Sequence, residues 1–266
     1  MQNLRRFIYE IYEKRYLLYQ LTKRDFIQKY VETYLGLTWA IFEPLATTII
    51  LSVIFSFGFK AAPVQDIPFF LYMFSGMVAF NYFSMATGEG TNVIRSYSFL
   101  VKKVNFRLSI LPIVKVLSCS MFHLIMLGLL FITLIVYGYY PSIYWFQFFY
   151  YFFAMNILIL GISWLTSAVS VFVPDVRHIV SIGLQFLFYL SPVFWSVDNV
   201  PGKWAFLPKL NPLFYIINGY RDTFIYHKPF WVHLEVTVYY WVISFAFLFL
   251  GIITFKRLRP HFADVI

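Results

Sequence analysis

The sequence predicts an all-α integral membrane protein with six transmembrane helices, an N-terminal amphipathic interface helix, and a re-entrant or external helical gate between the fifth and sixth helices. Of its 266 residues, 61% are hydrophobic and only 12% are charged. A soluble domain is about half apolar and about a quarter charged, and the apolar residues here form stretches long enough to cross a bilayer several times. An ordinary soluble globular protein is therefore excluded.

The first 37 residues contain seven basic residues and no uninterrupted apolar run. We therefore expect no secretory signal peptide and an N-terminus that stays in the cytoplasm. The segment suits an amphipathic helix on the membrane surface, although a soluble helix packed on a partner has the same pattern. Apolar residues at three- and four-residue steps oppose a charged face: Leu4, Phe7, Ile8, Ile11 and Leu18 against Arg5, Glu10, Glu13 and Lys14.

Six apolar stretches follow, each near the roughly 20 residues that span ~30 Å of hydrocarbon. They are residues 38–59, 67–87, 109–137, 144–172, 179–197 and 230–255. A seventh stretch, residues 210–220, is shorter, contains Pro212 and has charged residues on both sides. Such a segment is more typical of a re-entrant or interfacial helix than of a spanning one.

The placement of basic residues supports six crossings, because short cytoplasmic loops accumulate lysine and arginine. With a cytoplasmic N-terminus, 15 of the 21 basic residues fall inside and five fall outside, while Lys115 lies within the third span. A seventh crossing at residues 210–220 would put the basic C-terminal tail outside. The net charge of +9 is thus a topology signal, and no nucleic-acid partner is needed to explain it.

One membrane domain, residues 1–266, is expected, because no linker, low-complexity tract or repeat divides the chain. Two connections are long enough to be functional. The second cytoplasmic loop, residues 88–108, is polar, begins Gly88-Glu89-Gly90 and is predicted to continue as a short helix over residues 92–101. The last external connection, residues 196–229, holds the short apolar stretch.

Sequence signatures of soluble enzymes are absent. The only Gly-Lys pair, Gly202-Lys203, is followed by Trp204, so the chain has no P-loop for a nucleotide. No H-E-x-x-H motif occurs, and the single cysteine, Cys119, excludes an intrachain disulfide framework and a multi-cysteine metal site. We expect no catalytic residue and no metal in this chain. A lone membrane histidine such as His123 is typical of a helix-helix hydrogen bond.

Few ionisable residues lie in the predicted spans, and all are near an interface: Glu43, Lys115 and Glu235. A long side chain there can reach water, so most of the cost of its charge is avoided. An ion-coupled carrier ordinarily needs a carboxylate at the midplane, and the predicted spans contain none. The pattern argues against a secondary transporter and leaves a passive channel open.

Aromatic side chains make up 23% of the chain and offer a path for a sugar. Their rings present flat apolar faces, and tyrosine and tryptophan add a hydrogen-bonding group at the edge, so both surfaces of a sugar ring can be matched. Aromatic residues also populate interface belts and lipid-facing surfaces, which is the alternative explanation. The candidates for a substrate path are Phe55, Tyr72, Phe80, Tyr82, Phe83, Tyr189, Phe194 and Trp195.

Three groups of short motifs lie around the start of the first span, at the end of the fifth span and before the sixth span. They are Leu21-Thr22-Lys23-Arg24-Asp25-Phe26 with Tyr30, Leu35-Gly36, Trp39 and Pro44, then Ser191-Pro192, and then Asn211-Pro212-Leu213 through Arg221. These stretches resemble the membrane subunit of ABC-2 type exporters for polysaccharides such as O-antigen, capsule and teichoic acid. The resemblance covers essentially the whole chain and departs at Pro174-Asp175, where an Arg-Asp pair is expected.

The resemblance implies a homodimer bound to two copies of a separate nucleotide-binding subunit. That subunit would bind ATP and Mg²⁺ and hydrolyse the ATP, so this chain would bind no cofactor itself. The N-terminal helix would be an interfacial gate element. Coupling to the ATPase would involve Asn92, Arg95, Lys102 and Lys103, and the external gate would involve Asn211, Pro212 and Arg221.

The resemblance also suggests a headgroup entrance at the cytoplasmic side, formed by Arg24, Asp25, Tyr30 and Trp39. Arginine presents a planar fork to phosphate oxygens, so Arg24 and Asp25 are placed to meet a lipid pyrophosphate. The other explanation of these two residues is positive-inside anchoring plus a local ion pair.

Together, the residues and the resemblance lead to a hypothesis. The chain would be a multi-pass permease of the inner (plasma) membrane, surrounded by membrane lipid and with both termini cytoplasmic, that exports an undecaprenyl-linked, O-antigen-like glycan. An ABC-2 permease for a drug or a small lipid is one alternative. A membrane enzyme acting on lipid-linked sugars is another, and it should show grouped carboxylates and histidines, which this chain does not group in sequence.

Overall fold

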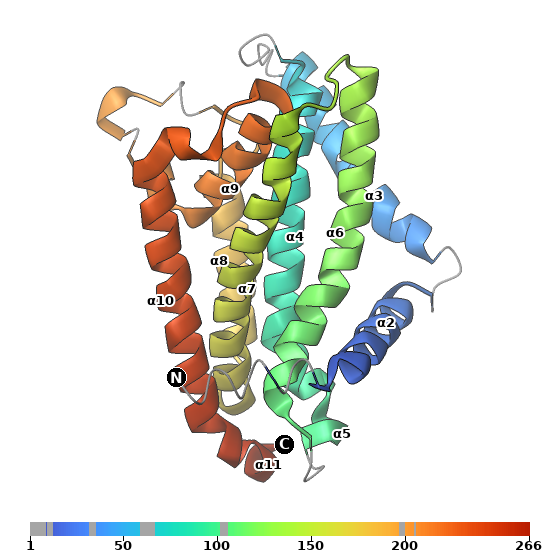
Figure 1. Ribbon diagram of the computed structural model, residues 1–266, viewed down its shortest axis with the longest axis vertical. Coiled ribbons are helices and arrows are strands. Elements are labelled where there is room, and N and C mark those ends of the chain that lie inside the picture. The colour runs from blue at the N-terminus through green and yellow to red at the C-terminus, as the bar shows by residue number, and fades with distance from the viewer. Residues whose placement is uncertain are drawn as a thin grey trace.

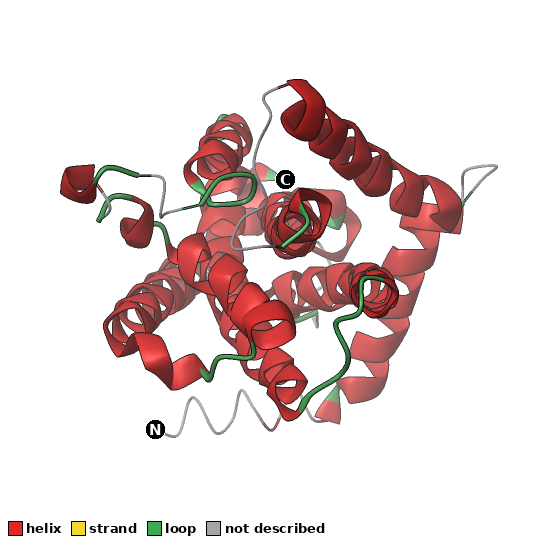
Figure 2. Cartoon of the chain, turned by 90° about the horizontal axis from the view of Figure 1, so that it is seen from above, coloured by secondary structure: helices red, strands yellow, loops and turns green. Residues whose placement is uncertain are grey.

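The predicted all-α fold class is confirmed by the computed structural model, which describes residues 9, 13–31, 36–58, 67–101, 106–196, 200–204 and 206–266. Long helices form a bundle, and the helix at the N-terminal side lies obliquely against one end (Figure 1, Figure 2). The main helices are α2 (Arg15–Val31), α3 (Leu37–Val53), α4 (Phe69–Ser96), α5 (Ser98–Val101), α6 (Leu111–Val136), α7 (Gln147–Phe172), α8 (Val176–Leu190), α9 (Pro212–Arg221), α10 (Leu234–Leu258) and α11 (Phe262–Val265). Shorter turns are η1 (Ile54–Gly58), η2 (Leu108–Ile110), η3 (Ile143–Phe146), η5 (Gly202–Trp204), η6 (Pro208–Leu210), η7 (Asp222–Tyr226), η8 (Phe230–His233) and η9 (Arg259–His261).

We call the end of the bundle that holds α5 and α11 the inner end, and the end that holds α9 the outer end (Figure 1). Within the described residues, five helical segments are long and apolar enough to cross a membrane: Ile41–Gly58, Phe69–Ser96, Leu108–Val136, Ile143–Phe172 and Phe230–Val265. They correspond to five of the six predicted spans.

The fifth predicted span, residues 179–197, forms a shorter helix than the sequence suggested. Helix α8 has 15 residues and ends at Leu190. The next residue, Ser191, is extended, with ψ at 143°, because a residue that precedes proline is disfavoured in the helical region. Pro192 therefore ends α8 well before residue 197.

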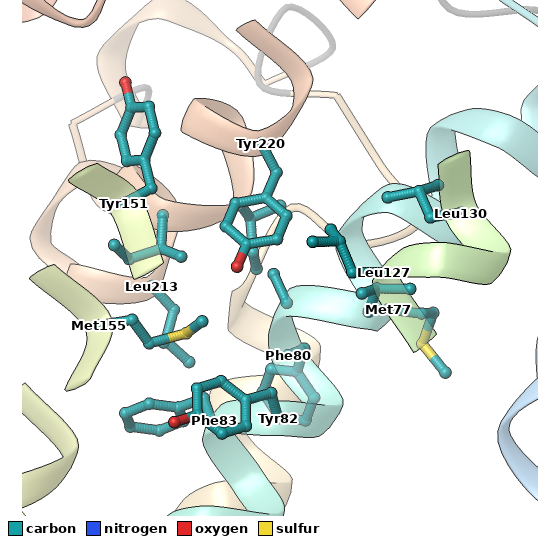
Figure 3. Packing of buried hydrophobic residues seen from close by; sticks show 14 of the residues in the cluster. Met77, Phe80, Tyr82, Phe83, Leu127, Leu130, Tyr151, Met155, Leu213 and Tyr220 are labelled. Atoms are coloured by element: carbon teal, nitrogen blue, oxygen red, sulfur yellow. The ribbon is translucent and has the colours of Figure 1, made fainter. Parts of the chain in front are cut away.

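Helix α4 is the centre of the bundle, in contact with α3, α6, α7, α8 and α9. Much of the core consists of its side chains together with apolar and aromatic residues of α6, α7 and α9 (Figure 3). By contrast, α8 has no buried residue. Its apolar surface must therefore be covered by lipid or by another protein surface.

The polar loop predicted from residue 88 is wrong for its first half, because α4 continues without a break to Ser96. Polar groups in this part find partners on α7. The Thr91 hydroxyl lies 2.8 Å from that of Thr166, and Ser170 donates to the Thr91 carbonyl at 2.9 Å. A side chain on Gly90 would collide with Ser163. Small and hydroxylated residues here thus allow two helices to approach closely, rather than marking a loop.

The N-terminal helix begins, as an unbroken α-helix, at Arg15. Most of the predicted amphipathic residues, including Leu4, Phe7, Ile8 and Ile11, lie outside the described residues. Helix α2 packs on α6 through a buried stripe of Leu18, Thr22 and Asp25, and Leu18 contacts Ile110 and Val114. Its described partner is therefore the bundle of its own chain.

The external connection contains the expected short helix. Helix α9 has ten residues, packs on α4, α7 and α10, and continues into the π-helical turn η7. His227 ends this turn in the left-handed conformation, with φ at 52°. The predicted stretch 210–220 is thus folded onto the outer end of the bundle.

Candidate functional site

A polar cleft separates α4 from α8 in the inner half of the bundle. Eight residues of α4 line it, and four of these recur every four residues and are small or polar: Ser84, Gly88, Asn92 and Ser96. Arg177, Ser181 and Leu184 line the facing side on α8, and the cleft has a volume of about 560 Å³. A polar stripe inside an otherwise apolar bundle is costly unless it faces water or a ligand. The cleft is therefore a candidate path for a polar substrate.

Aromatic rings continue the same seam toward the outer end. Phe80 of α4 lies 5.0 Å from Phe188 of α8, measured between ring centroids. Phe188 lies 5.6 Å from Phe194, and Phe194 lies 5.3 Å from Phe55 of η1, which follows α3. Tyr189 also contacts Phe194 and is 63% exposed. We call the cleft and these five rings the α4–α8 seam.

The eight predicted path aromatics therefore divide into two groups. Phe55, Tyr189 and Phe194 belong to the outer part of the seam and are at least partly exposed, and Trp195, which is also partly exposed, follows Phe194 in the chain. Tyr72, Phe80, Tyr82 and Phe83 are at most 5% exposed and belong to the core. Figure 3 shows Phe80, Tyr82 and Phe83 among other core residues. Phe188, which joins the two groups, was not among the predicted path residues.

The hydroxyl groups of the buried tyrosines form hydrogen bonds to neighbouring segments of the bundle. The Tyr82 hydroxyl donates to Asn156 on α7 and lies 2.7 Å from the Ser120 hydroxyl on α6. The Tyr72 hydroxyl donates to the Trp195 carbonyl at 3.0 Å. His123 Nε2 lies 2.9 Å from the Tyr220 hydroxyl, which confirms the predicted helix-helix role of this histidine. These groups hold the core together.

Four ionisable side chains from three helices meet near the inner end, and we call them the inner charge cluster: Asp25, Lys29, Glu89 and Lys115. The Lys115 ammonium lies 2.8 Å from Asp25 and 3.2 Å from Glu89, and Lys29 lies 2.8 Å from Glu89. Tyr97 donates to Asp25 at 2.8 Å. The expectation that Lys115 reaches water at the interface is wrong, because it is buried and paired with two carboxylates.

The predicted headgroup entrance is only partly assembled. Asp25 is buried and pairs with Lys115 of α6, so its ion pair is not local. Arg24 is exposed and borders the cavity beside the cluster. Trp39 is half exposed and packs edge-on against Phe42. The side chain of Tyr30 lies outside the described part.

Of the predicted coupling residues, Lys102 and Lys103 lie outside the described residues. Asn92 and Arg95 belong to α4, and Asn92 donates to the Gly88 carbonyl one turn earlier. Arg95 donates to the carbonyls of Ser170 and Val171. A cation there complements the C-terminal end of α7, so Arg95 fastens two helix ends together.

The predicted external gate residues are all structural anchors at the outer end. Asn211 is the N-cap of α9, because its side-chain oxygen accepts from the Leu213 amide at 2.9 Å. Its amide group also donates to the Ser191 hydroxyl, which follows α8. Pro212 occupies the first turn, where a missing N–H is harmless. The N-cap thus joins α9 to the end of α8.

Replacing Asn211 by alanine is expected to lower stability by about 1 kcal/mol, because the cap is lost. Thermal unfolding in detergent would measure the change. Asn211→Ser is the matched variant, since serine caps helices about as well as asparagine and should recover most of the loss. Equal destabilisation by both substitutions would contradict the capping role.

Arg221 is 1% exposed and joins three segments at the outer end. Its guanidinium donates to the carbonyls of Tyr72 and Val193 and to the Asn218 side chain, and it lies 3.5 Å from the centre of the Tyr72 ring. A Cβ on Gly76 would lie 2.9 Å from the nearest guanidinium nitrogen. Glycine at this position therefore makes the space that Arg221 fills.

A cavity of about 300 Å³ lies beside Arg221. Lys209, Lys228 and His233 are its exposed basic lining residues, and Asp222 is buried at its wall. Burial raises the pKa of the Asp222 carboxyl above its ordinary value, and His233 at 3.9 Å opposes this shift. The outer end thus carries a second polar recess, separate from the α4–α8 seam.

Comparison of the sequence with known proteins identifies related membrane transport proteins. The sequence profile described as ABC-2 type transporter matches residues 16–225. Two proteins named O-antigen export system permease protein RfbA, both from Klebsiella pneumoniae, are 24% identical over 258 and 252 residues, with 94% of this chain and 95% of each relative covered. A protein of the same name from Myxococcus xanthus is 26% identical over 269 residues, with 98% and 99% covered.

Proposed function

Because the chain belongs to the ABC-2 type transporter family and is homologous to O-antigen export permeases, we propose that it is the channel-forming permease of an ATP-driven exporter. Its cargo is an undecaprenyl-linked polysaccharide of the O-antigen type, which moves outward across the inner membrane. Six crossings, with α8 as the fifth, leave both termini in the cytoplasm. Helix α9 and its flanking turns cover the external exit.

The α4–α8 seam is the observation that carries this proposal. Its inner half offers hydroxyl, amide and guanidinium groups for sugar hydroxyls, and its outer half offers flat aromatic rings. A surface of this kind suits a glycan that must slide without being held. The seam borders α8, which has no buried residue. A second copy of the chain would cover that helix and close the path, as expected for a homodimer.

Energy comes from a separate subunit in this proposal. The chain has no P-loop, so ATP and Mg²⁺ are bound by two nucleotide-binding partners. Their contact lies at the inner end, around residues 92–103, where α4 ends and α5 follows. Arg95 joins the end of α4 to the end of α7. A movement of the ATPase partner at this end would therefore move both long helices.

Filling the cleft tests the function. Ser181→Leu places an apolar side chain in the polar lining and is expected to reduce the glycan exported per permease at least about tenfold, because hydroxyl contacts are lost and space is filled. Cell-surface glycan and permease abundance would be measured in the same cells. Thr133→Leu on α6, away from the seam, is the control and should retain export.

Co-purification with an ATPase subunit is measured in parallel. A permease that stays alone, with export intact in its absence, would contradict the proposal. Retained export in Ser181→Leu at normal abundance would remove the cleft from the path.

A further inference from the structure

Two cavities of the inner half share a wall at Glu89. The first is the cleft between α4 and α8. The second lies under α2, has a volume of about 410 Å³ and is bordered by Arg24, Asp25, Lys29, Glu89, Ser96 and Lys115. Glu89 and Ser96 line both cavities. A group that moved from beneath α2 toward the seam would therefore pass Glu89.

Glu89 bridges two ammonium groups with its two oxygens. Oε1 accepts from Lys29 at 2.8 Å, and Oε2 accepts from Lys115 at 3.2 Å. Basic side chains hold a phosphoryl group in a similar way, because two oxygens of one anionic group each accept from a different donor. The carboxylate thus occupies a position that suits a phosphoryl group.

The inner charge cluster has a fixed half and an accessible half. The side chains of Asp25 and Lys115 are 8% and 10% exposed, and Tyr97 further holds Asp25. The side chains of Lys29 and Glu89 are 28% and 33% exposed. A partly solvated ion pair contributes little net stability. Glu89 is therefore the more easily displaced of the two carboxylates, while Asp25 keeps Lys115 in place.

The charges match a diphosphate once Glu89 has left. The cavity wall then carries Arg24, Lys29 and Lys115 against Asp25, which leaves two positive charges. A diphosphate that links a lipid to a sugar carries about two negative charges, and basic side chains bind phosphate oxygens strongly. With Glu89 in place the excess is a single positive charge.

We propose that Glu89 is an internal carboxylate that occupies the place of the substrate's diphosphate on Lys29 and Lys115, and that the diphosphate of a lipid-linked substrate displaces it beside Arg24 of the expected headgroup entrance. This inference rests on the proposed function. Displacement of Glu89 opens the shared wall between the two cavities. Binding of the headgroup would therefore also give the attached sugar access to the seam.

Binding to the permease and its ATPase partner in lipid nanodiscs tests the site, with farnesyl diphosphate and inorganic pyrophosphate as probes. Glu89→Gln removes the competing charge and is expected to tighten binding of farnesyl diphosphate about tenfold. Lys29→Gln is expected to weaken it about tenfold. Lys23→Gln, on the same helix but outside the cavity lining, should bind as the natural protein does. Size-exclusion profiles check that each variant is folded.

Inorganic pyrophosphate should compete with farnesyl diphosphate in the natural protein and more strongly in Glu89→Gln. Competition by pyrophosphate identifies the phosphate groups as the recognised part. Equal affinity of all variants, or binding that pyrophosphate does not reduce, would show that only the lipid chain is held and would overturn the inference. The proposed function would survive that result, since it is tested by export and by co-purification.

Discussion

Replacing Arg221 by methionine is expected to destabilise the outer end of the bundle by roughly 3 kcal/mol and to abolish the proposed glycan export. The substitution keeps an unbranched apolar stem, is about two atoms shorter, and removes every donor. The carbonyls of Tyr72 and Val193 and the side chain of Asn218 would lose a partner. Each buried polar group left without a partner costs roughly 1–3 kcal/mol, so an intermediate total is expected after relaxation.

The measurement is thermal unfolding of the purified permease, together with glycan export in cells. Lys203→Met is the matched control, because Lys203 is an exposed basic residue of the same external connection. That variant should unfold at the Tm of the natural protein. An Arg221→Met protein that is as stable as the control would show that the guanidinium contacts contribute no net stability.

Replacing Gly161 by alanine is expected to cost about 2–3 kcal/mol, although alanine is the better helix former. A Cβ at Gly161 would lie 2.5 Å from the Leu248 nitrogen and 2.8 Å from the Phe247 carbonyl carbon. Both atoms are backbone, so no side chain can turn aside, and α7 and α10 would have to separate. Overpacking of this kind costs roughly 1–3 kcal/mol.

Gly128→Ala on α6 is the control for this prediction. No atom lies within 4 Å of a Cβ at Gly128, so the substitution should be neutral or stabilise by up to about 1 kcal/mol through helix propensity. Thermal unfolding of both variants in the same detergent gives the comparison. Equal behaviour of the two glycines would mean that α7 and α10 can separate freely.

Much of the helical framework could be predicted from the sequence, because long apolar stretches have few alternatives in a membrane. The error at residues 88–96 has a physical cause. Gly88-Glu89-Gly90 is polar and glycine-rich, which ordinarily favours a loop. In the folded chain Gly90 admits Ser163 of α7, and Glu89 is neutralised by two lysines. A single sequence shows neither neighbour.

The inner charge cluster could not be predicted for a related reason. Lys115 and Lys29 each had an ordinary explanation in sequence, as an interfacial residue and as a topology signal. Their meeting with Asp25 and Glu89 depends on where α2 crosses α6, and no pattern within either helix encodes that crossing. The burial of the aromatic candidates could not be predicted either, because a buried Tyr82 and an exposed Tyr189 look alike in composition.

The short length of α8 bears on the thickness of the barrier that a polar cargo meets. Fifteen helical residues rise only about 22 Å, against ~30 Å of hydrocarbon in an ordinary bilayer. If α8 is the fifth crossing, as in the proposed six-span arrangement, local thinning of the bilayer would accommodate its short length. Headgroups and water would then approach both ends of the α4–α8 seam, and the dry interval left for sugars to cross would be several ångströms shorter than along the neighbouring helices.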